Sequence, residues 1–302
     1  MSEVALADLP DARAVLGQAG AENFPVALRL LRPEERRHLL ALYGYARLVD
    51  DIGDELDGPP ARRLAALDLV EGELAGALEG QPSHPVIEAV AASVTELGLD
   101  PVHLRCLLEA NRQDQVKATY ASFDELLQYC SLSANPVGRL VLGIFREEGA
   151  EKETCSDLVC SGLQLVEHLQ DVAEDYGLGR VYLPQDDLAR FGVAANSLSR
   201  RPPTQPAGAA FRRLMAFEVS RARQLLRAGA RLVGLVGDWR LAIAVAGFAG
   251  GGLAQLAAIE QAGYDVLSHQ LKASSAAVAR TALALAGRER LAAARRNRGP
   301  AA

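Results

Sequence analysis

Apolar residues recur at helical spacing along most of the chain. Leu39, Leu42 and Ala46 follow one another at intervals of three or four residues, and later segments repeat this period. Such spacing places apolar side chains on one face of an α-helix. We therefore predict helices over residues 33–52, 59–74, 100–118, 154–176, 210–227 and 240–263, and one that begins near Ser122 and leads into Leu126 and Leu127. Alternating strand patterns are lacking, so the pattern predicts an all-α fold of roughly eight to ten helices.

Glycine, proline and capping residues predict where several helices begin and end. Ser122 followed by Glu125 is typical of a capping box at a helix start. Pro136 lies inside an apolar stretch and is expected to break it. Gly177 and Gly179 are expected to end the 154–176 helix, because glycine readily adopts the backbone conformation that closes a helix.

One segment has the length of a membrane span. Residues 241–259 contain no charged side chain and approach the roughly 20 residues that cross a bilayer. The segment is mostly Ala and Gly and includes Gln255, so it has little of the transfer energy of a true span. We expect an internal helix whose small residues either allow close packing or line a pocket for a long apolar ligand.

Two acidic clusters share one arrangement. Asp50 and Asp54 are four residues apart, as are Asp171 and Asp175. On a helix these carboxylates share a face about 5.4 Å apart along the axis, where like charges repel. A hard divalent cation such as Mg²⁺ would offset that repulsion, because it prefers carboxylates and phosphate oxygens as ligands. A solvated acidic helix face is the alternative for either cluster alone.

Each cluster extends into a longer polar stripe. Tyr43 and Arg47 precede Asp50 on one helix, and Gln164 and Glu167 precede Asp171 on another. The other faces of both helices are apolar, so both stripes are expected to face inward and to form a clamp for a metal-bound diphosphate. Arg47 would then pair with the diphosphate. Such a clamp promotes departure of diphosphate from carbon, and the resulting carbocation needs an apolar, water-poor pocket.

Composition excludes several other classes of protein. Hydrophobic residues make up 49% and charged residues 23%, which is typical of a globular protein. The net charge of −6 argues against nucleic-acid binding. The four cysteines are too scattered for a disulfide scaffold or zinc site and are expected to be reduced, and no signal-peptide pattern opens the chain. We expect a cytoplasmic protein without a dinucleotide-binding or P-loop motif.

Two segments carry a resemblance to a known family. They are ALYGYARLVDDIGD at residues 41–54 and the run from Gly162 to Pro184, which contains LQLVEHLQDVAED followed by GRVYLP. Here the chain resembles the squalene/phytoene synthase family. The resemblance implies a class I isoprenoid synthase, a helical bundle around a central cavity. It implies a single domain over residues 1–302, with a core of about 20–287 and a basic tail, 288–302, that could be disordered.

The resemblance also implies roles for individual residues. Asp50, Asp54, Asp171 and Asp175 would bind Mg²⁺. Glu167 stands where the family usually has Asn and would offer a charged oxygen to the metal. The residues that would contact the diphosphate or shape its site are Tyr43, Arg47, Gln164, Arg180 and Tyr182.

Three positions resemble the hydroxysqualene-forming branch of the family. Asn23 and Phe24 stand where condensing members carry Ser-x-Ser-Phe, Gln170 stands where they tend to have Arg, and Asn135 lies in a matching SANPVG segment. This branch converts presqualene diphosphate into hydroxysqualene without a reductant, in hopanoid synthesis. Asn135, His168 and Gln170 are candidates to position the attacking water, although the place of His168 on the helix favours an ordinary helix histidine somewhat over a functional role.

Alternatives remain at this point. One is a condensing synthase that makes presqualene diphosphate, squalene or phytoene, and another is a non-catalytic relative that keeps the fold for binding or assembly. The expected partner is an isoprenoid diphosphate and not a nucleic acid. Because substrate and product are lipids, peripheral contact with the inner face of the membrane stays open, as does the oligomeric state.

Overall fold

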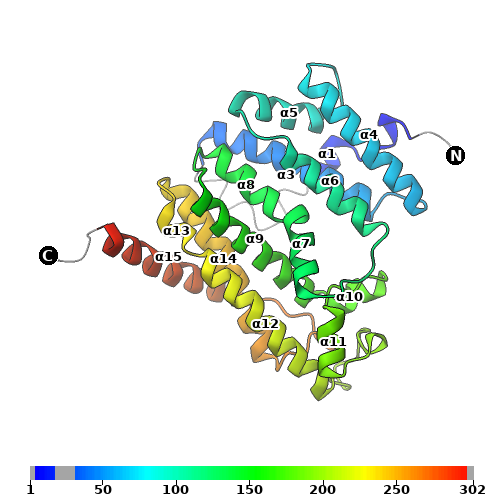
Figure 1. Ribbon diagram of the computed structural model, residues 1–302, viewed down its shortest axis with the longest axis vertical. Helices are drawn as coiled ribbons and strands as arrows, with labels where there is room; N and C mark the ends of the chain where they lie inside the picture. The colour runs from blue at the N-terminus through cyan, green and yellow to red at the C-terminus, as the bar shows by residue number, and fades with distance from the viewer. Residues whose placement is uncertain (1–3, 18–30, 298–302) are drawn as a thin grey trace. The chain divides into compact units, whose positions relative to one another are not determined.

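The predicted all-α fold is confirmed. The computed structural model describes residues 4–17 and 31–297, and within these ranges every regular element is a helix (Figure 1). The described β-pairing is a single isolated bridge between Thr119 and Val181. Ten of the described helices have at least ten residues, in agreement with the predicted number.

The described chain divides into two compact units. The first comprises residues 1–116 and 132–148, and the second comprises residues 117–131 and 149–302. Helices of the first unit are α1 (Ala12–Gly17), α3 (Pro33–Asp54), α4 (Pro60–Leu78), α5 (Pro85–Leu97), α6 (Val102–Asp114) and α8 (Asn135–Ile144). Helix α7 (Phe123–Ser133) lies mostly in the second unit, whose other helices are α9 (Ala150–Gln170), α10 (Val172–Gly177), α11 (Gln185–Phe191), α12 (Ala209–Gly229), α13 (Leu232–Leu235), α14 (Trp239–Gln261) and α15 (Ser275–Asn297).

Helix α3 is the centre of the first unit. It packs against α4, α5, α6 and α8 (Figure 1). Its apolar stripe, which includes Tyr45, Leu48 and Ile52, is fully buried. Pro33 opens the helix, where the missing N–H of proline costs nothing. Burial of this stripe fixes the rotation of α3 and therefore the direction in which its polar residues project.

The second unit is built from closely packed long helices. Helix α12 packs along α9, and α14 packs along α15. A Cβ at Gly250 of α14 would lie 2.6 Å from the Cα of Ala282 in α15, so only glycine allows this approach. Helix α14 has the length and composition of a membrane span, but more than half of its most apolar window is buried inside the protein. The expected internal helix is what the packing supports.

Two helix boundaries predicted from the sequence were wrong, and part of the basic tail belongs to a helix. The predicted helix over 154–176 is interrupted at Asp171, whose φ of −102° and ψ of 16° leave the helical conformation. Helix α6 ends at Asp114 and does not reach residue 118. The predicted basic tail is helical as far as Asn297, because α15 packs against α14 and α13.

The other boundary predictions can be compared directly. Pro136 lies in the first turn of α8, so the predicted break is confirmed. The Ser122 hydroxyl accepts a hydrogen bond from the N–H of Glu125, while the Glu125 carboxylate accepts one from Ala121, so only half of the capping box forms. All four cysteines are free thiols. The number of domains stays a prediction.

Candidate active site

The first acidic cluster lies in the last turn of α3. Asp54 is the final residue of the helix, and Asp50, Asp51 and Glu55 lie within one turn of it. No basic residue lies in this turn. The C-terminus of a helix already carries partial negative charge, so carboxylates are unfavourable there. The cluster therefore concentrates negative charge where a cation would be stabilising.

Asp50 is held by a donor from another helix. The Asn111 side-chain amide of α6 donates to Asp50 Oδ1 over 3.1 Å and also to the backbone carbonyl of Leu107 over 3.2 Å. Although part of the Asp50 side chain is exposed, loss of hydration raises the pKa of its carboxyl to about 7. Asn111 opposes this rise, and repulsion from Asp54 adds to it. Asp50 thus carries a charge that lacks full compensation from the described residues around it.

Asn111 and Gln115 were missed by the sequence analysis. Gln115 donates to the backbone carbonyls of Gly53 and Asn111, over 3.0 and 3.1 Å, and so ties α6 to the acidic turn of α3. The two residues continue the stripe of Leu104 and Leu108, two buried leucines of α6. Polar residues that interrupt a buried apolar stripe at helical spacing were the available signal.

Arg47 lies beside the cluster and is already paired. Its Nε is 2.6 Å from Asp51 Oδ1, and its terminal nitrogen donates to Glu55 over 3.0 Å. Asp51 is buried, and that burial raises the pKa of its carboxyl, which Arg47 opposes. Tyr43 is half-buried one turn before Arg47. The predicted stripe of Tyr43, Arg47, Asp50 and Asp54 is thus present on α3, with Arg47 oriented by two carboxylates.

The second acidic cluster begins at the break between α9 and α10. The carbonyl of Asp171 accepts hydrogen bonds from the N–H groups of Glu174 and Asp175, each over 2.9 Å. This turn keeps Asp171 and Asp175 one helical turn apart despite the break. Partial burial and the neighbouring Asp175 raise the pKa of Asp171 to about 6, and Glu174 adds to the rise. The acids at the start of α10 are favourably placed for its dipole.

His168 connects three predicted site residues of the second unit. Its Nε2 lies 3.3 Å from Gln164 Nε2, and its Nδ1 lies 3.9 Å from Asp175 Oδ2. The ring stacks on Tyr182, with centroids 3.7 Å apart and planes 13° apart. Tyr182 in turn stacks on buried Tyr120. Burial lowers the pKa of His168, while Asp175 opposes this, so the imidazole is held neutral beside a carboxylate.

A small pocket lies in the second unit beside His168. Its lining is mostly apolar and consists of Leu126, Leu165, His168, Leu169, Tyr182, Leu183, Pro184 and Glu218. Burial raises the pKa of Glu218 to about 8, and Arg221 opposes the shift. The pocket places an apolar surface next to the polar residues of the second cluster.

The remaining predicted residues occupy separate positions. Glu167 is exposed on α9, and Gln170 is half-buried at the end of that helix. The backbone N–H of Arg180 donates to the carbonyl of Asp175 over 2.8 Å, which holds the GRVYLP segment against α10. Asn135 is half-buried at the start of α8. Predicted substrate residues Asn23 and Phe24 lie outside the described residues.

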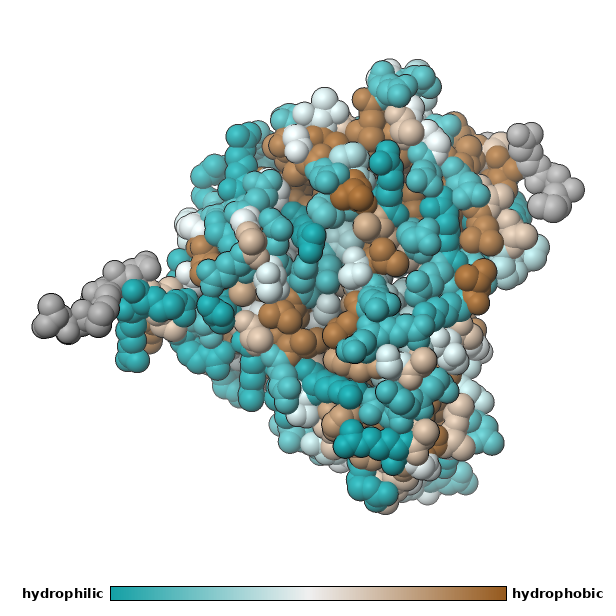
Figure 2. Space-filling view, viewed as in Figure 1, coloured by the Kyte–Doolittle hydropathy of each residue, from teal (hydrophilic) through white to brown (hydrophobic). Residues whose placement is uncertain are grey.

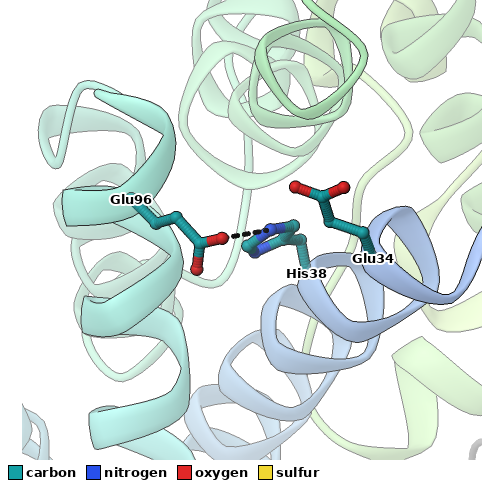
Figure 3. A group of neighbouring side chains, drawn as sticks. All are labelled: Glu34, His38 and Glu96. Atoms are coloured by element: carbon teal, nitrogen blue, oxygen red, sulfur yellow. Dashed lines mark ion pairs between the residues drawn. The ribbon is translucent and has the colours of Figure 1, made fainter.

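A further group of possible metal ligands lies away from both clusters. Glu34, His38 and Glu96 place one donor atom each within 4.8 Å of one another (Figure 3). A terminal guanidinium nitrogen of Arg37 donates hydrogen bonds to the two carboxylate oxygens of Glu96, over 2.8 and 2.9 Å. The same nitrogen lies 3.3 Å from Nε2 of His38. The guanidinium thus supplies positive charge to this group. We interpret it as an ion-pair network that joins α3 to α5.

The two aspartate clusters suit a hard divalent cation better. Each offers carboxylate oxygens one turn apart, and in each one carboxyl has a raised pKa because of lost hydration and a neighbouring aspartate. A bound cation would relieve this repulsion and keep the carboxylates ionised. Oxygen donors of this kind are the ligands that hard divalent cations prefer.

Comparison with known proteins decides the family. The sequence profile of the squalene/phytoene synthase family matches residues 18–277. The chain belongs to the squalene/phytoene synthase family. It is 37% identical to a hydroxysqualene synthase of Sinorhizobium fredii over 73% of each chain, and 39% identical to one of Rhodopseudomonas palustris over 74% of each. Phytoene synthase 1 of Solanum lycopersicum is 36% identical over 58% of this chain and 43% of its own length.

Solved structures agree with this assignment. Squalene synthase HpnC from Alicyclobacillus acidocaldarius has a TM-score of 0.76 and 38% identity, covering 86% of this chain and 98% of its own. A dehydrosqualene synthase shares the fold at a TM-score of 0.79 with 23% identity, covering 92% of this chain and 96% of its own. The chain is therefore an isoprenoid synthase with the all-α fold of this family.

Proposed function

We propose that the protein converts presqualene diphosphate and water into hydroxysqualene and diphosphate, with Mg²⁺ as cofactor. The observation that carries the proposal is the pair of aspartate clusters, each with a carboxyl of raised pKa, in a chain whose curated relatives include hydroxysqualene synthases. Similarity to such a relative over about three quarters of both chains supports a shared activity. The family match over residues 18–277 spans both clusters and the GRVYLP segment that follows the second.

The acidic residues have a direct role in this reaction. Bound Mg²⁺ would neutralise the diphosphate and so favour its departure from the cyclopropylcarbinyl carbon. Asp50, Asp54, Asp171 and Asp175 would hold the metal, with Glu167 as an additional oxygen donor. Asn111 would keep Asp50 ionised and oriented, because its amide donates to one carboxylate oxygen and leaves the other available.

Arg47 would serve the diphosphate through its orientation. Its contacts with Asp51 and Glu55 fix the guanidinium beside the acidic turn of α3. A guanidinium that is already held in place loses less conformational entropy when it binds a phosphate oxygen. Its planar arrangement of N–H donors also matches the geometry of an oxyanion. Tyr43 lies on the same side of the helix one turn earlier and would shape the same site.

Water must reach the rearranged cation at one carbon only. Three residues were predicted to position it, and His168 has the surroundings that suit a proton acceptor, since it is neutral and lies beside Asp175. Its proton would be shared with that carboxylate after water adds. Gln170 and Asn135 offer neutral polar groups and remain alternatives.

A second function has one observation in its favour. The phytoene synthase of Solanum lycopersicum is 36% identical to this chain over the matched residues. Membership of the family is therefore also compatible with a condensing synthase that joins two prenyl diphosphates. Gln170, and Asn23 with Phe24, depart from the pattern of condensing members and argue for the hydroxysqualene branch. A non-catalytic relative would be expected to lose motif aspartates, and all four are present.

Product analysis tests the proposal. Purified protein with Mg²⁺ and without NADPH receives presqualene diphosphate in one reaction and farnesyl diphosphate in another, and the products are identified by mass spectrometry. Hydroxysqualene from presqualene diphosphate alone is the expected result. Product from farnesyl diphosphate alone would establish a condensing synthase, and folded protein that is inactive in both reactions would establish a non-catalytic relative.

A further inference from the structure

The C-terminal helix carries an exposed apolar stripe. Leu283 is 74% exposed and Leu291 is 65% exposed, and both belong to α15. They are eight residues apart, which places them on one face two turns from each other. The opposite face packs against α14 and α13 and includes buried Leu285 and Glu289. Helix α15 therefore has a buried side that holds it in place and an exposed side that is rich in Leu and Ala.

Positive charge surrounds this stripe. The exposed arginines of α15 are Arg280, Arg288, Arg290, Arg295 and Arg296. Glu289 is the one acidic residue of the helix, and it is buried with its carboxylate 2.9 Å from Arg288. The exposed face thus combines leucines with several arginines and no exposed carboxylate, in a chain whose net charge is −6. Figure 2 shows the hydrophilic residues at the end of α15 that adjoins the C-terminal trace.

The neighbouring helix adds apolar side chains. Trp239 and Ile243 at the start of α14 are about half exposed. Trp239, Ile243 and Gly250 share one face of α14, because Ile243 and Gly250 follow Trp239 by four and eleven positions. At Gly250 this face meets Ala282 of α15. The Trp239 ring also lies 4.8 Å from the guanidinium carbon of Arg240. Tryptophan beside arginine is typical of side chains that sit at a membrane interface.

Most of α15 also lies beyond the residues that match the family. The family match ends at residue 277, whereas α15 runs from Ser275 to Asn297. None of the predicted metal or diphosphate residues belongs to it. The exposed stripe therefore has no role in the site described above and needs a separate explanation.

We propose that the exposed face of α15, with Trp239 and Ile243, binds the surface of an anionic membrane. The helix would lie in the plane of the interface, with its leucines at the level of the acyl boundary and its arginines among the lipid phosphates. A self-association surface would have to bring this positive face against an acidic one, and α15 offers no exposed acid. The inference goes beyond the proposed reaction and does not depend on it.

Vesicle co-sedimentation of the full chain tests the proposal. Vesicles of phosphatidylcholine alone and of phosphatidylcholine with phosphatidylglycerol are compared at about 0.1 M and about 1 M salt, which differ about threefold in screening length. The protein is expected to bind the anionic vesicles at low salt, to bind the neutral vesicles weakly, and to be released at high salt.

Two double variants separate the apolar and charged contributions. Leu283→Ser with Leu291→Ser is expected to weaken binding to anionic vesicles at least about tenfold, because two apolar side chains lose their burial. Arg290→Gln with Arg295→Gln is expected to weaken it roughly 25-fold, since each arginine near an anionic surface contributes roughly fivefold. All four positions are exposed, so the fold should be unaffected.

Control variants remove an exposed apolar side chain or two exposed arginines at positions outside α15. Val116→Ser removes an apolar side chain that is 76% exposed in the first unit. Arg213→Gln with Arg227→Gln removes two exposed charges from α12. Both controls are expected to bind anionic vesicles like the parent protein.

The outcomes are distinct from those of the reaction itself. The proposal would be overturned if the parent protein did not bind anionic vesicles. It would also be overturned if the α15 variants bound these vesicles as well as the parent does. A dimer that the leucine variant dissociates, without vesicle binding, would overturn it in favour of self-association. Synthase activity is measured in parallel in detergent: a parent that binds vesicles but forms no product would contradict the proposed function and leave the membrane surface supported.

Discussion

The contact between Gly53 and Asn111 allows a sharp test of how α3 presents Asp50. A Cβ at Gly53 would lie 2.0 Å from the Asn111 side-chain oxygen and 3.0 Å from its amide carbon. Gly53→Ala must therefore move the amide of Asn111, which is a buried residue. The expected consequence is loss of the 3.1 Å hydrogen bond to Asp50.

The size of the effect follows from that bond. A hydrogen bond to a charged group contributes about 1.5–3 kcal/mol, which corresponds to a roughly 10- to 100-fold change in an equilibrium. Without it, the pKa of Asp50 rises above the present value of about 7, so less of the carboxylate is ionised at neutral pH. We expect Gly53→Ala to raise the Mg²⁺ concentration for half-maximal diphosphate release by roughly 10-fold or more. Alanine gains up to about 1 kcal/mol over glycine in a helix, so stability should change less than activity.

Diphosphate release at varied Mg²⁺, together with thermal unfolding, is the assay. Asn111→Leu removes the same donor from the other side and should reproduce the shift in Mg²⁺ dependence. Gly72→Ala of α4 is the matched control, since a Cβ there meets nothing within 4 Å. It should keep the parent activity and stabilise the helix slightly. Parent-like Mg²⁺ dependence in both Gly53→Ala and Asn111→Leu would refute the role given to this contact.

Three further predictions concern the clusters and the packing. Asp50→Ala or Asp171→Ala should abolish turnover while the helical circular dichroism stays intact, and full activity in either variant would contradict the metal-binding assignment. Burial raises the pKa of Glu218 from 4.5 to about 8, so protonated Glu218 stabilises the fold at low pH. The free energy of unfolding should therefore fall as the pH rises from about 4.5 to about 8, and denaturant titrations at several pH values measure this fall. In Glu218→Gln the free energy of unfolding should depend less on pH over the same range. An unchanged pH dependence in this variant would exclude the Glu218 carboxyl as the cause. Gly250→Ala should lower the melting temperature by several degrees, because its Cβ would meet the backbone of Ala282; parent-like melting would show that α14 and α15 can separate at no cost.

The elements that depend on local sequence were predictable. The period of Leu39, Leu42 and Ala46 predicted α3, and the spacing of Asp50 and Asp54 placed both carboxylates on one side of it. These features depend on residues within one or two turns of each other. The family resemblance rested on the same local motifs, and the comparisons confirmed it.

The errors concern contacts between residues far apart in the sequence. Helical period gave no sign of the break at Asp171, because no glycine or proline adjoins it and the carbonyl of Asp171 still accepts hydrogen bonds from Glu174 and Asp175. Asn111 approaches Asp50 from 61 positions away, and only the packing of α6 on α3 brings the two together. Helix α15 has a weak apolar period, and its packing against α14 at Gly250 was not visible locally.

The direct test of the proposed reaction is the source of the oxygen atom in the product. Presqualene diphosphate is incubated with the protein and Mg²⁺ in water enriched in ¹⁸O, and the product is analysed by mass spectrometry. Capture of the rearranged cation by water predicts hydroxysqualene that carries one ¹⁸O atom. A hydrocarbon product, or hydroxysqualene without the label, would contradict the account.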